Sequence, residues 1–179
     1  MANLKLKNPA GGSLNFVSAD GASDLTVTFP ATTGTAMVSG NMPAFSAYAS
    51  ATQSVSTTTF TKVVFDVERF DTNSNFASST FTPTVAGYYQ ISHAMYLGGA
   101  ASGSTFTYLY KNGTNYAGLT RIANSNAVNL LNSVSCLVYC NGTTDYLEIY
   151  IYQNSGGTVT EGNGDPSGCW FTGAMVRSA

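Results

Sequence analysis

Asp145-Tyr-Leu-Glu-Ile-Tyr-Ile-Tyr-Gln-Asn-Ser-Gly156 decides the fold, because two kinds of residue alternate along it for the length of a whole β-strand. One side of this run is aliphatic and consists of Leu147, Ile149 and Ile151. The other side is mostly aromatic and consists of Tyr146, Glu148, Tyr150 and Tyr152. A period of two is typical of a strand, since successive side chains point to opposite faces. A tyrosine-rich side with one charge is not an ordinary solvated face, so we expect another copy of the chain to cover it.

Similar runs continue through residues 43–179, separated by turns rich in Asn and Gly. Strands are predicted at 43–50, 62–66, 88–97, 105–111, 114–119, 128–140 and 168–177, and loops at 70–76 and 156–164. Asn112-Gly113 is a strong hairpin signal, because a type I′ turn needs positive φ at both central residues, and Asn141-Gly142 is predicted to be the next hairpin turn. No helical period persists, and hairpins at such regular spacing are typical of a β-sandwich or jelly roll.

The composition excludes several classes of protein. Only 9% of the residues are charged, against about 25% in an ordinary domain, while 12% are aromatic, which argues against disorder. The seven Lys and Arg residues are scattered, so no nucleic-acid partner is expected. No apolar stretch has transmembrane length, so no membrane partner is expected either. The stretch Met1–Lys7 lacks the apolar core of a secretory signal, and synthesis in the cytosol is expected.

Residues 1–42, which we call the arm, differ from residues 43–179, which we call the head. Three short alternating runs at 4–7, 13–17 and 24–29 are interrupted by Gly and Pro. Each run is too short to build a core alone, so we predict that the arm is an anchor that pairs with another chain or protein. The candidate anchor residues are Leu4, Leu6, Leu14, Phe16, Leu25, Val27 and Phe29.

Residues that carry chemistry are sparse, and no catalytic residue, metal site or cofactor is predicted. His93 is the only histidine, and a packed sheet or interface histidine is favoured over a catalytic base. No His or Cys pair has the spacing of metal ligands. The clustered acids are interpreted as solvated loop charges in preference to Ca²⁺ ligands; they are Asp66, Glu68, Asp71, Glu161 and Asp165. A hydrolase that uses Glu161 or Asp165 is the third and least favoured hypothesis.

The three cysteines are expected to be buried free thiols. Cys136 and Cys140 fall on one face of a predicted strand and are too far apart to bridge each other. A disulfide between Cys169 and one of them stays open, but free thiols in a reducing cytosol are favoured.

The head resembles the globular domain shared by the first complement component and tumour necrosis factor. The matching stretches, in chain order, are 45–47, 64–66, 70–76, Phe81-Thr-Pro-Thr-Val-Ala-Gly-Tyr-Tyr-Gln-Ile91, Leu109-Tyr-Lys-Asn-Gly113, 145–150 and Phe171-Thr-Gly-Ala174. The resemblance implies a TNF-like jelly roll that forms a homotrimer, in which aromatic residues of the inner sheet line a three-fold axis. The candidate trimer-interface residues are Tyr88, Tyr89, His93, Tyr150, Tyr152 and Trp170.

The arm has a resemblance of its own. Leu25-Thr-Val-Thr-Phe-Pro-Ala-Thr-Thr-Gly-Thr-Ala-Met-Val-Ser-Gly40 is similar to a segment of tailed-phage fibre and virion-surface proteins. A collagen-like stalk is absent, which argues against a secreted complement-like or cytokine-like role. With few residues before the head, the leading hypothesis is a non-enzymatic homotrimeric cement or decoration knob on a phage capsid. The arm would then bind the major capsid protein or another virion protein. The alternative is the receptor-binding tip of a short tail fibre that recognises host-surface carbohydrate.

Overall fold

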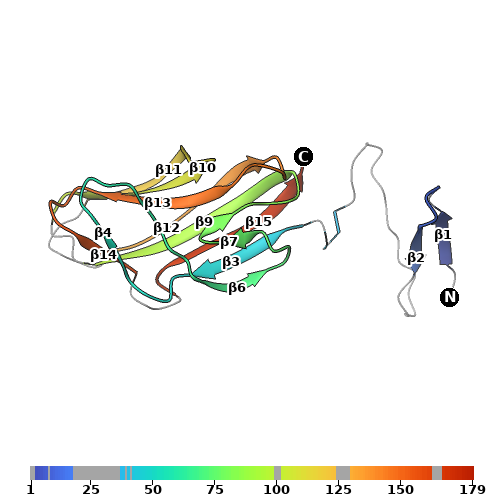
Figure 1. The fold of residues 1–179 in the computed structure, drawn as a ribbon, viewed down its shortest axis with the longest axis horizontal. Helices are drawn as coiled ribbons and strands as arrows, with labels where there is room; N and C mark the ends of the chain where they lie inside the picture. The colour runs from blue at the N-terminus through green and yellow to red at the C-terminus, as the bar shows by residue number, and fades with distance from the viewer. Residues whose placement is uncertain are drawn as a thin grey trace, which may run out of the picture. The chain divides into compact units, whose positions relative to one another are not determined.

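The computed structural model describes residues 3–7, 9–17, 37–38, 40, 42–98, 102–123, 130–162 and 167–179. The chain divides into two compact units, residues 1–34 and residues 35–179 (Figure 1). Every regular element of appreciable length in the described part is a β-strand. Within that part, no helix is long and apolar enough to cross a membrane.

The first unit contains one hairpin, formed by β1 (Asn3–Lys7) and β2 (Ser13–Val17). The two strands pair antiparallel, and their register sets Leu4 opposite Phe16 and Leu6 opposite Leu14. Four candidate anchor residues therefore occupy two adjacent cross-strand positions. The predicted strand at 24–29, with Leu25, Val27 and Phe29, lies outside the described residues. A two-stranded hairpin on its own is only marginally stable in water.

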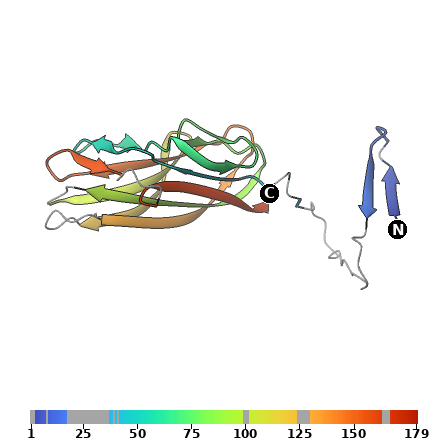
Figure 2. The same cartoon turned by 90° about the horizontal axis from the view of Figure 1, so that it is seen from below.

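The head has two sheets, which Figure 2 shows as two layers. We name the first one the β13 sheet, and its strands run in the order β11-β10-β13-β8-β7, with β5 also paired to β13. Its strands are β5 (Thr61–Lys62), β7 (Phe76–Ala77), β8 (Thr80–Phe81), β10 (Ser104–Lys111), β11 (Thr114–Ala123) and β13 (Leu147–Gln153). β13 lies in the middle of this sheet, between β10 and β8.

The second one, the β9 sheet, has the order β4-β14-β9-β15-β3-β6, with β12 also paired to β9. Its strands are β3 (Ala44–Tyr48), β4 (Gln53–Val55), β6 (Val67–Asp71), β9 (Gly87–Gly98), β12 (Leu130–Cys140), β14 (Val159–Glu161) and β15 (Trp170–Ser178). The first strand of the head, β3, pairs along its whole length with the last strand, β15. This closure of first strand upon last is what makes the sandwich a jelly roll.

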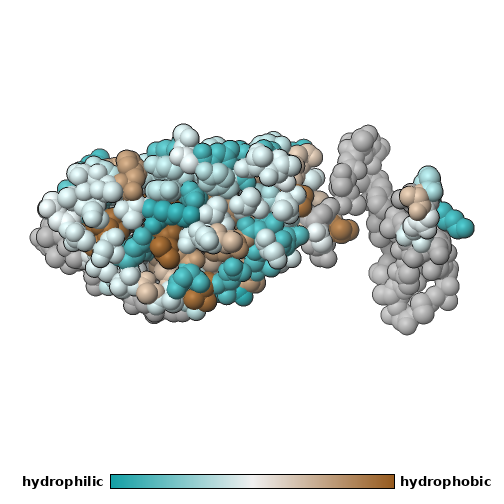
Figure 3. Space-filling model, in the orientation of Figure 1, coloured by the Kyte–Doolittle hydropathy of each residue, from teal (hydrophilic) through white to brown (hydrophobic). Residues whose placement is uncertain are grey.

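Aromatic and aliphatic side chains from both sheets fill the space between the layers. Phe45 lies at the centre, with ring centroids 4.9 Å from Phe76, 4.3 Å from Phe81 and 4.8 Å from Phe171. The predicted aliphatic side of β13 is confirmed, since Leu147, Ile149 and Ile151 are fully buried. On the side of the molecule that Figure 3 shows, apolar residues form only small separate patches.

Close packing explains why the Phe-Thr-Gly stretch of β15 has a glycine, Gly173, at its third position. A Cβ atom at this position would lie 2.6 Å from Cδ1 of Ile91 and 2.7 Å from Cε1 of Phe45. The absence of a side chain lets β15 pack directly against the central phenylalanine.

Three predicted segments differ in the structure. Asn141-Gly142 is not a hairpin turn, because it joins β12 of the β9 sheet to β13 of the β13 sheet. Residues 62–66 are strand only at Lys62, because the chain then crosses from the β13 sheet to the β9 sheet. Along this crossing the backbone amides of Val64 and Phe65 donate to the side chains of Gln53 and Ser79 instead of to a neighbouring strand. The predicted surface loop at 156–164 contains β14, whose Val159 and Glu161 are buried.

Both ends of the head lie at the same end of the sandwich. The amide of Met175 donates to the carbonyl of Pro43 over 3.0 Å, and the amide of Ala179 donates to the carbonyl of Ala86 over 3.2 Å. We call this end, where the arm enters the head, the proximal end.

Candidate functional site

The outward side of the β9 sheet, which we call the β9 face, carries exposed apolar side chains and no acid on the strands β3, β9, β12 and β15. Its alternating outward positions include Tyr88, Leu137, Tyr139, Trp170, Thr172 and Ala174. The exposed fractions of Leu137, Tyr139 and Tyr88 are 52%, 40% and 38%. The strands β3, β9, β12 and β15 contain no Asp or Glu. Large exposed apolar side chains without acids are typical of a surface that a partner covers.

The cations beside the β9 face lie against aromatic rings. The guanidinium of Arg177 lies 6.0 Å from the ring centroid of Tyr88, and that of Arg69 lies 5.0 Å from the ring centroid of Tyr48. Rings attract cations through their negative faces. A partner that packed on this face would therefore meet positive charges that already have favourable contacts.

The outward side of the β13 sheet carries a second aromatic surface. We call it the aromatic face, and it consists of Phe60, Phe106, Tyr108, Tyr110, Tyr150 and Tyr152. The strand register sets Phe106 opposite Tyr152 and Tyr108 opposite Tyr150. Phe60, just before β5, completes the surface, with its ring centroid 4.9 Å from that of Tyr152 and 5.4 Å from that of Tyr108. The molecule thus presents two aromatic surfaces on opposite layers.

The six candidate interface residues do not share one surface. Tyr88 and Trp170 lie on the β9 face, whereas Tyr150 and Tyr152 lie on the aromatic face of the other sheet. Tyr89 has no exposed surface and belongs to the core, where its hydroxyl donates to the carbonyl of Val85 over 2.6 Å. The prediction that Tyr89 is a trimer-interface residue is wrong, because a side chain buried in its own chain cannot line an axis between chains.

His93 is likewise buried, so the packed interpretation holds and the interface interpretation does not. Its side chain has no exposed surface, and Nε2 lies 3.2 Å from the hydroxyl of Thr107. Its Nδ1 has no partner among the described residues. Burial lowers the pKa of His93 to about 4, which keeps the ring neutral at physiological pH.

The three cysteines are free thiols, as predicted. Cys140 and Cys169 are buried, and Cys136 is half-buried. The thiol of Cys169 donates to Oε1 of Glu161, which is itself fully buried. Burial raises the pKa of Cys140 to about 11, so its thiol is protonated and unreactive.

The acids predicted to be solvated loop charges behave in different ways. Asp66 is exposed, and hydrogen bonds from Ser50 lower its pKa. Asp71 caps a turn by accepting from the amides of Asn73 and Phe76. Glu161 is the exception, since it is a buried strand residue, and Asp165 lies outside the described residues. Nowhere in the described ranges do three His, Cys, Asp or Glu side chains gather as metal ligands would.

Glu161 combines deep burial with an unpartnered oxygen. Its Oε2 has no hydrogen-bond partner among the described residues, while Oε1 accepts from Cys169. Burial raises the pKa of Glu161 to about 7, because a charged carboxylate is poorly solvated there. The sequence offered no signal for this position, since Gly residues surround the short strand β14.

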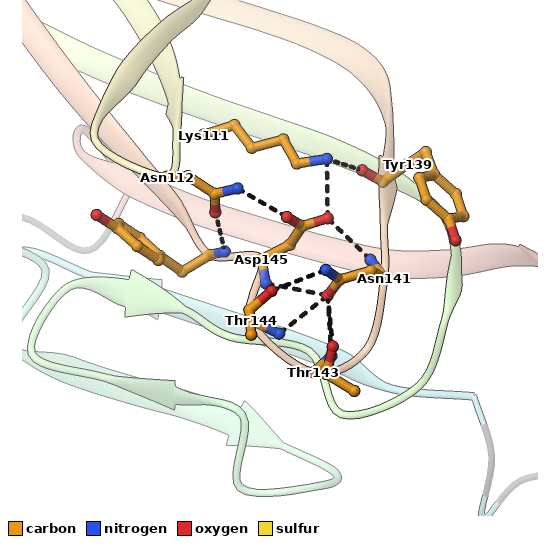
Figure 4. Close-up of polar contacts among 8 residues, drawn as sticks. Lys111, Asn112, Tyr139, Asn141, Thr143, Thr144 and Asp145 are labelled. Carbon is orange, nitrogen blue, oxygen red and sulfur yellow. Dashed lines mark hydrogen bonds and ion pairs between the residues drawn. The ribbon is translucent and has the colours of Figure 1, made fainter.

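A second buried acid, Asp145, joins two turns at the proximal end (Figure 4). Its Oδ1 accepts from Nδ2 of Asn112 over 2.7 Å, and its Oδ2 accepts from the amide of Asn141 over 2.9 Å. Nζ of Lys111 forms an ion pair with Oδ2 over 2.9 Å. Asn112 and Gly113 have φ of 54° and 73°, as the predicted type I′ turn requires. Both Asn-Gly-Thr stretches are thus built into turns, and Asp145 ties one turn to the other.

Comparison with known proteins identifies the fold and no closer relationship. No family model matches the chain, and no curated protein matches it. The globular domain of zebrafish complement 1qA is similar in structure, with a TM-score of 0.51 and 17% identity over 76% of this chain and 99% of that chain. Murine APRIL at pH 5.0 has a TM-score of 0.56 and 10% identity over 75% of this chain and 99% of its own. Eiger TNF from S. frugiperda has a TM-score of 0.50 and 13% identity over 77% of this chain and 93% of its own.

These likenesses agree with the two antiparallel sheets and with the closure of β3 on β15. The head of this chain therefore has the jelly-roll fold of the complement 1q and tumour necrosis factor domains, which confirms the predicted fold class.

Proposed function

We propose that the chain is a non-enzymatic structural protein of a phage virion surface. In this proposal it is made in the host cytoplasm and forms a homotrimeric cement or decoration knob on the capsid. The arm binds the major capsid protein or another virion protein. The observation that carries the proposal is the group of exposed apolar side chains on the β9 face, Leu137, Tyr139 and Tyr88, which a partner would cover. In the family that the sequence resembles, aromatic residues of the inner sheet line the three-fold axis, and in this proposal the β9 sheet takes that place.

The geometry of the head supports a common direction for three arms. Pro43 lies beside the end of β15, so each copy receives its arm at the proximal end. A three-fold axis along the sandwiches would bring three proximal ends together. Three linked arms bind a shell with an avidity roughly a hundredfold or more above one arm, provided that they reach their sites together.

The trimer can be tested with Leu137→Glu. Leu137 is half exposed in a single copy, so the substitution leaves the fold of one head intact but places a charge on the β9 face. We expect light scattering to report a trimer for the wild type and a monomer for this variant. Val64→Glu is the matched control, because Val64 is 47% exposed on the crossing segment and the same charge is added there. A monomeric wild type would contradict the proposal.

The anchor can be tested by removing residues 1–40. We expect the truncated protein to remain a trimer and to lose binding to capsids that lack this protein, as measured by co-sedimentation. A sharper variant is Leu6→Asp, since Leu6 is exposed and its strand position is one of the candidate anchor positions. Ser13→Asp adds the same charge on the hairpin at an exposed position that pairs with Lys7, and it should bind normally. Decoration of capsids by the truncated protein would rule out the arm as the anchor.

A receptor-binding tip of a short tail fibre is the second candidate function. The aromatic face favours it, because tyrosines offer both ring surfaces and hydroxyl groups to a sugar. Purified protein that adsorbs to host cells and blocks infection would support this function over cement.

A further inference from the structure

We propose that the aromatic face is a binding site for an uncharged glycan chain. The inference adds a ligand class to the proposed role at the virion surface. It rests on that proposed function in one respect, which is that trimer formation covers the β9 face and leaves the β13 sheet exposed.

The aromatic rings form a continuous surface across two strands and the residue before β5. β10 contributes Phe106, Tyr108 and Tyr110 at alternate positions, and β13 contributes Tyr150 and Tyr152 opposite them. The rings of Tyr110 and Tyr150 stack with centroids 4.1 Å apart, and those of Phe106 and Tyr108 stack at 6.2 Å. Alternate residues of a strand lie about 6.6 Å apart, so successive rings along β10 can contact successive parts of an extended ligand.

Contacts between neighbouring rings hold this surface in place before any ligand binds. The Phe60 ring contacts the rings of Tyr108, Tyr110 and Tyr152 at centroid distances between 4.9 and 6.4 Å. Side chains that are already packed lose little rotamer freedom on binding, which favours affinity for a small polar ligand.

The charges on this face are paired within the chain. Nζ of Lys62 and Oε1 of Glu148 lie 2.7 Å apart, and the hydroxyl of Thr80 contacts both groups. At the β11 edge, the guanidinium of Arg121 lies 5.6 Å from the ring centroid of Phe106. Among the described residues, the centre of the face therefore has no unpaired charge, which matches an uncharged ligand, and the cation Arg121 lies at the β11 edge.

The hydroxyl groups of the face are available to a ligand. Among the residues that the structure describes, none forms a hydrogen bond with the hydroxyls of Tyr108, Tyr110, Tyr150 or Tyr152. Burial, followed by the neighbouring Tyr110 and Tyr152, raises the pKa of Tyr108, so its phenol stays protonated and can both donate and accept. Rings that bind the C–H surface of a pyranose, with hydroxyls around them for its O–H groups, form a glycan site.

A second copy of the chain is a less suitable occupant. The face lacks the exposed aliphatic side chains, such as Leu137, that the β9 face offers to a protein partner. It presents unpartnered hydroxyls instead, which a dry protein interface would leave unsatisfied.

The site can be tested by native electrophoresis of the full-length protein in gels that contain dextran, laminarin or galactomannan, with alginate as the acidic polymer. We expect at least one neutral polymer, and not alginate, to retard the wild type. Tyr108→Ala and Phe60→Ala should weaken that binding roughly tenfold, since each removes a ring from the centre of the face. Tyr116→Ala is the matched control: Tyr116 is 49% exposed on β11 and has no ring contact among the described residues, so it should bind like the wild type.

Thermal midpoints and light scattering of each variant separate the outcomes. Retardation by no neutral polymer, or equal retardation of all variants, would overturn the site. A fall in the mass of the oligomer in Tyr108→Ala would instead identify the face as a contact between copies, which also overturns it. A monomeric protein that still binds a neutral polymer would remove the trimer from the proposed function and leave the glycan site standing.

Discussion

Asp145→Ala is expected to lower the free energy of unfolding by about 3 kcal/mol. The substitution removes a buried acceptor and leaves the amide of Asn141 and the side chain of Asn112 without their partner. It also leaves Lys111 facing the turn without its ion pair. Urea unfolding followed by tryptophan fluorescence would measure the loss, since Trp170 is the only tryptophan.

Two controls identify the cause of the Asp145 effect. Asp66→Ala removes the same charge at an exposed corner and should cost less than about 1 kcal/mol. Asp145→Asn keeps an acceptor but loses the ion pair, and its cost should lie between the two. Equal effects of Asp66→Ala and Asp145→Ala would show that the two turns are not tied together through this carboxylate.

The contribution of Asp145 also depends on pH. Burial alone would raise the pKa of Asp145, but hydrogen bonds from Asn112 and Lys111 outweigh it and hold the pKa below its usual value. The stabilisation is therefore present above the unfolded pKa of about 3.9 and is lost as the pH falls through the folded pKa.

Glu161→Gln is expected to remove the unfavourable contribution that ionisation of Glu161 makes to the stability of the wild type between about pH 4.5 and pH 7. The folded pKa of Glu161 is raised from 4.5 to about 7, so the folded state holds a proton that the unfolded state has released. The contribution of Glu161 to stability is then complete below pH 4.5 and falls as the pH rises to 7, by about 3 kcal/mol in total. The glutamine variant has no such proton, so its advantage over the wild type should grow by that amount across the same range. Urea midpoints at pH 4.5 and pH 8 would measure it.

The contribution of His93 to stability depends on pH in the opposite direction, so His93 provides a control. Its folded pKa is lowered from 6.5 to about 4, so the unfolded state holds the extra proton and stability rises between these pH values. The two effects nearly cancel in the wild type between pH 4.5 and pH 6.5. Glu161→Gln should therefore uncover a rising curve there, and His93→Gln a falling one. Parallel curves for Glu161→Gln and the wild type would contradict the burial of an ionisable carboxyl group.

The sequence predicted the long strands well because their side chains alternate. β13 has one aliphatic and one aromatic side, and β9 follows directly from the predicted strand at 88–97. The strands of two residues, β5, β7 and β8, are too short to show a period, and their existence depends on pairing with distant strands. Local patterns could not show where the chain crosses between the sheets, as it does after Lys62.

The surfaces were harder to predict than the strands. Period two assigns a residue to a side of its strand but not to a sheet, so Tyr88 and Tyr150 could not be placed on opposite layers. Tyr89 and His93 could have been assigned to the core, because they share their side of β9 with Ile91 and Met95. The burial of Glu161 follows from how β14 is inserted beside β9, and nothing near it in the sequence indicates this.

The position of β3 between β15 and β6 has a consequence for biosynthesis. Residues 44–48 cannot complete their pairing until residues 170–174, at the far end of the head, have been synthesised. Pairing over so long a separation in sequence slows folding. The β9 sheet therefore closes late, only when both β3 and β15 are available.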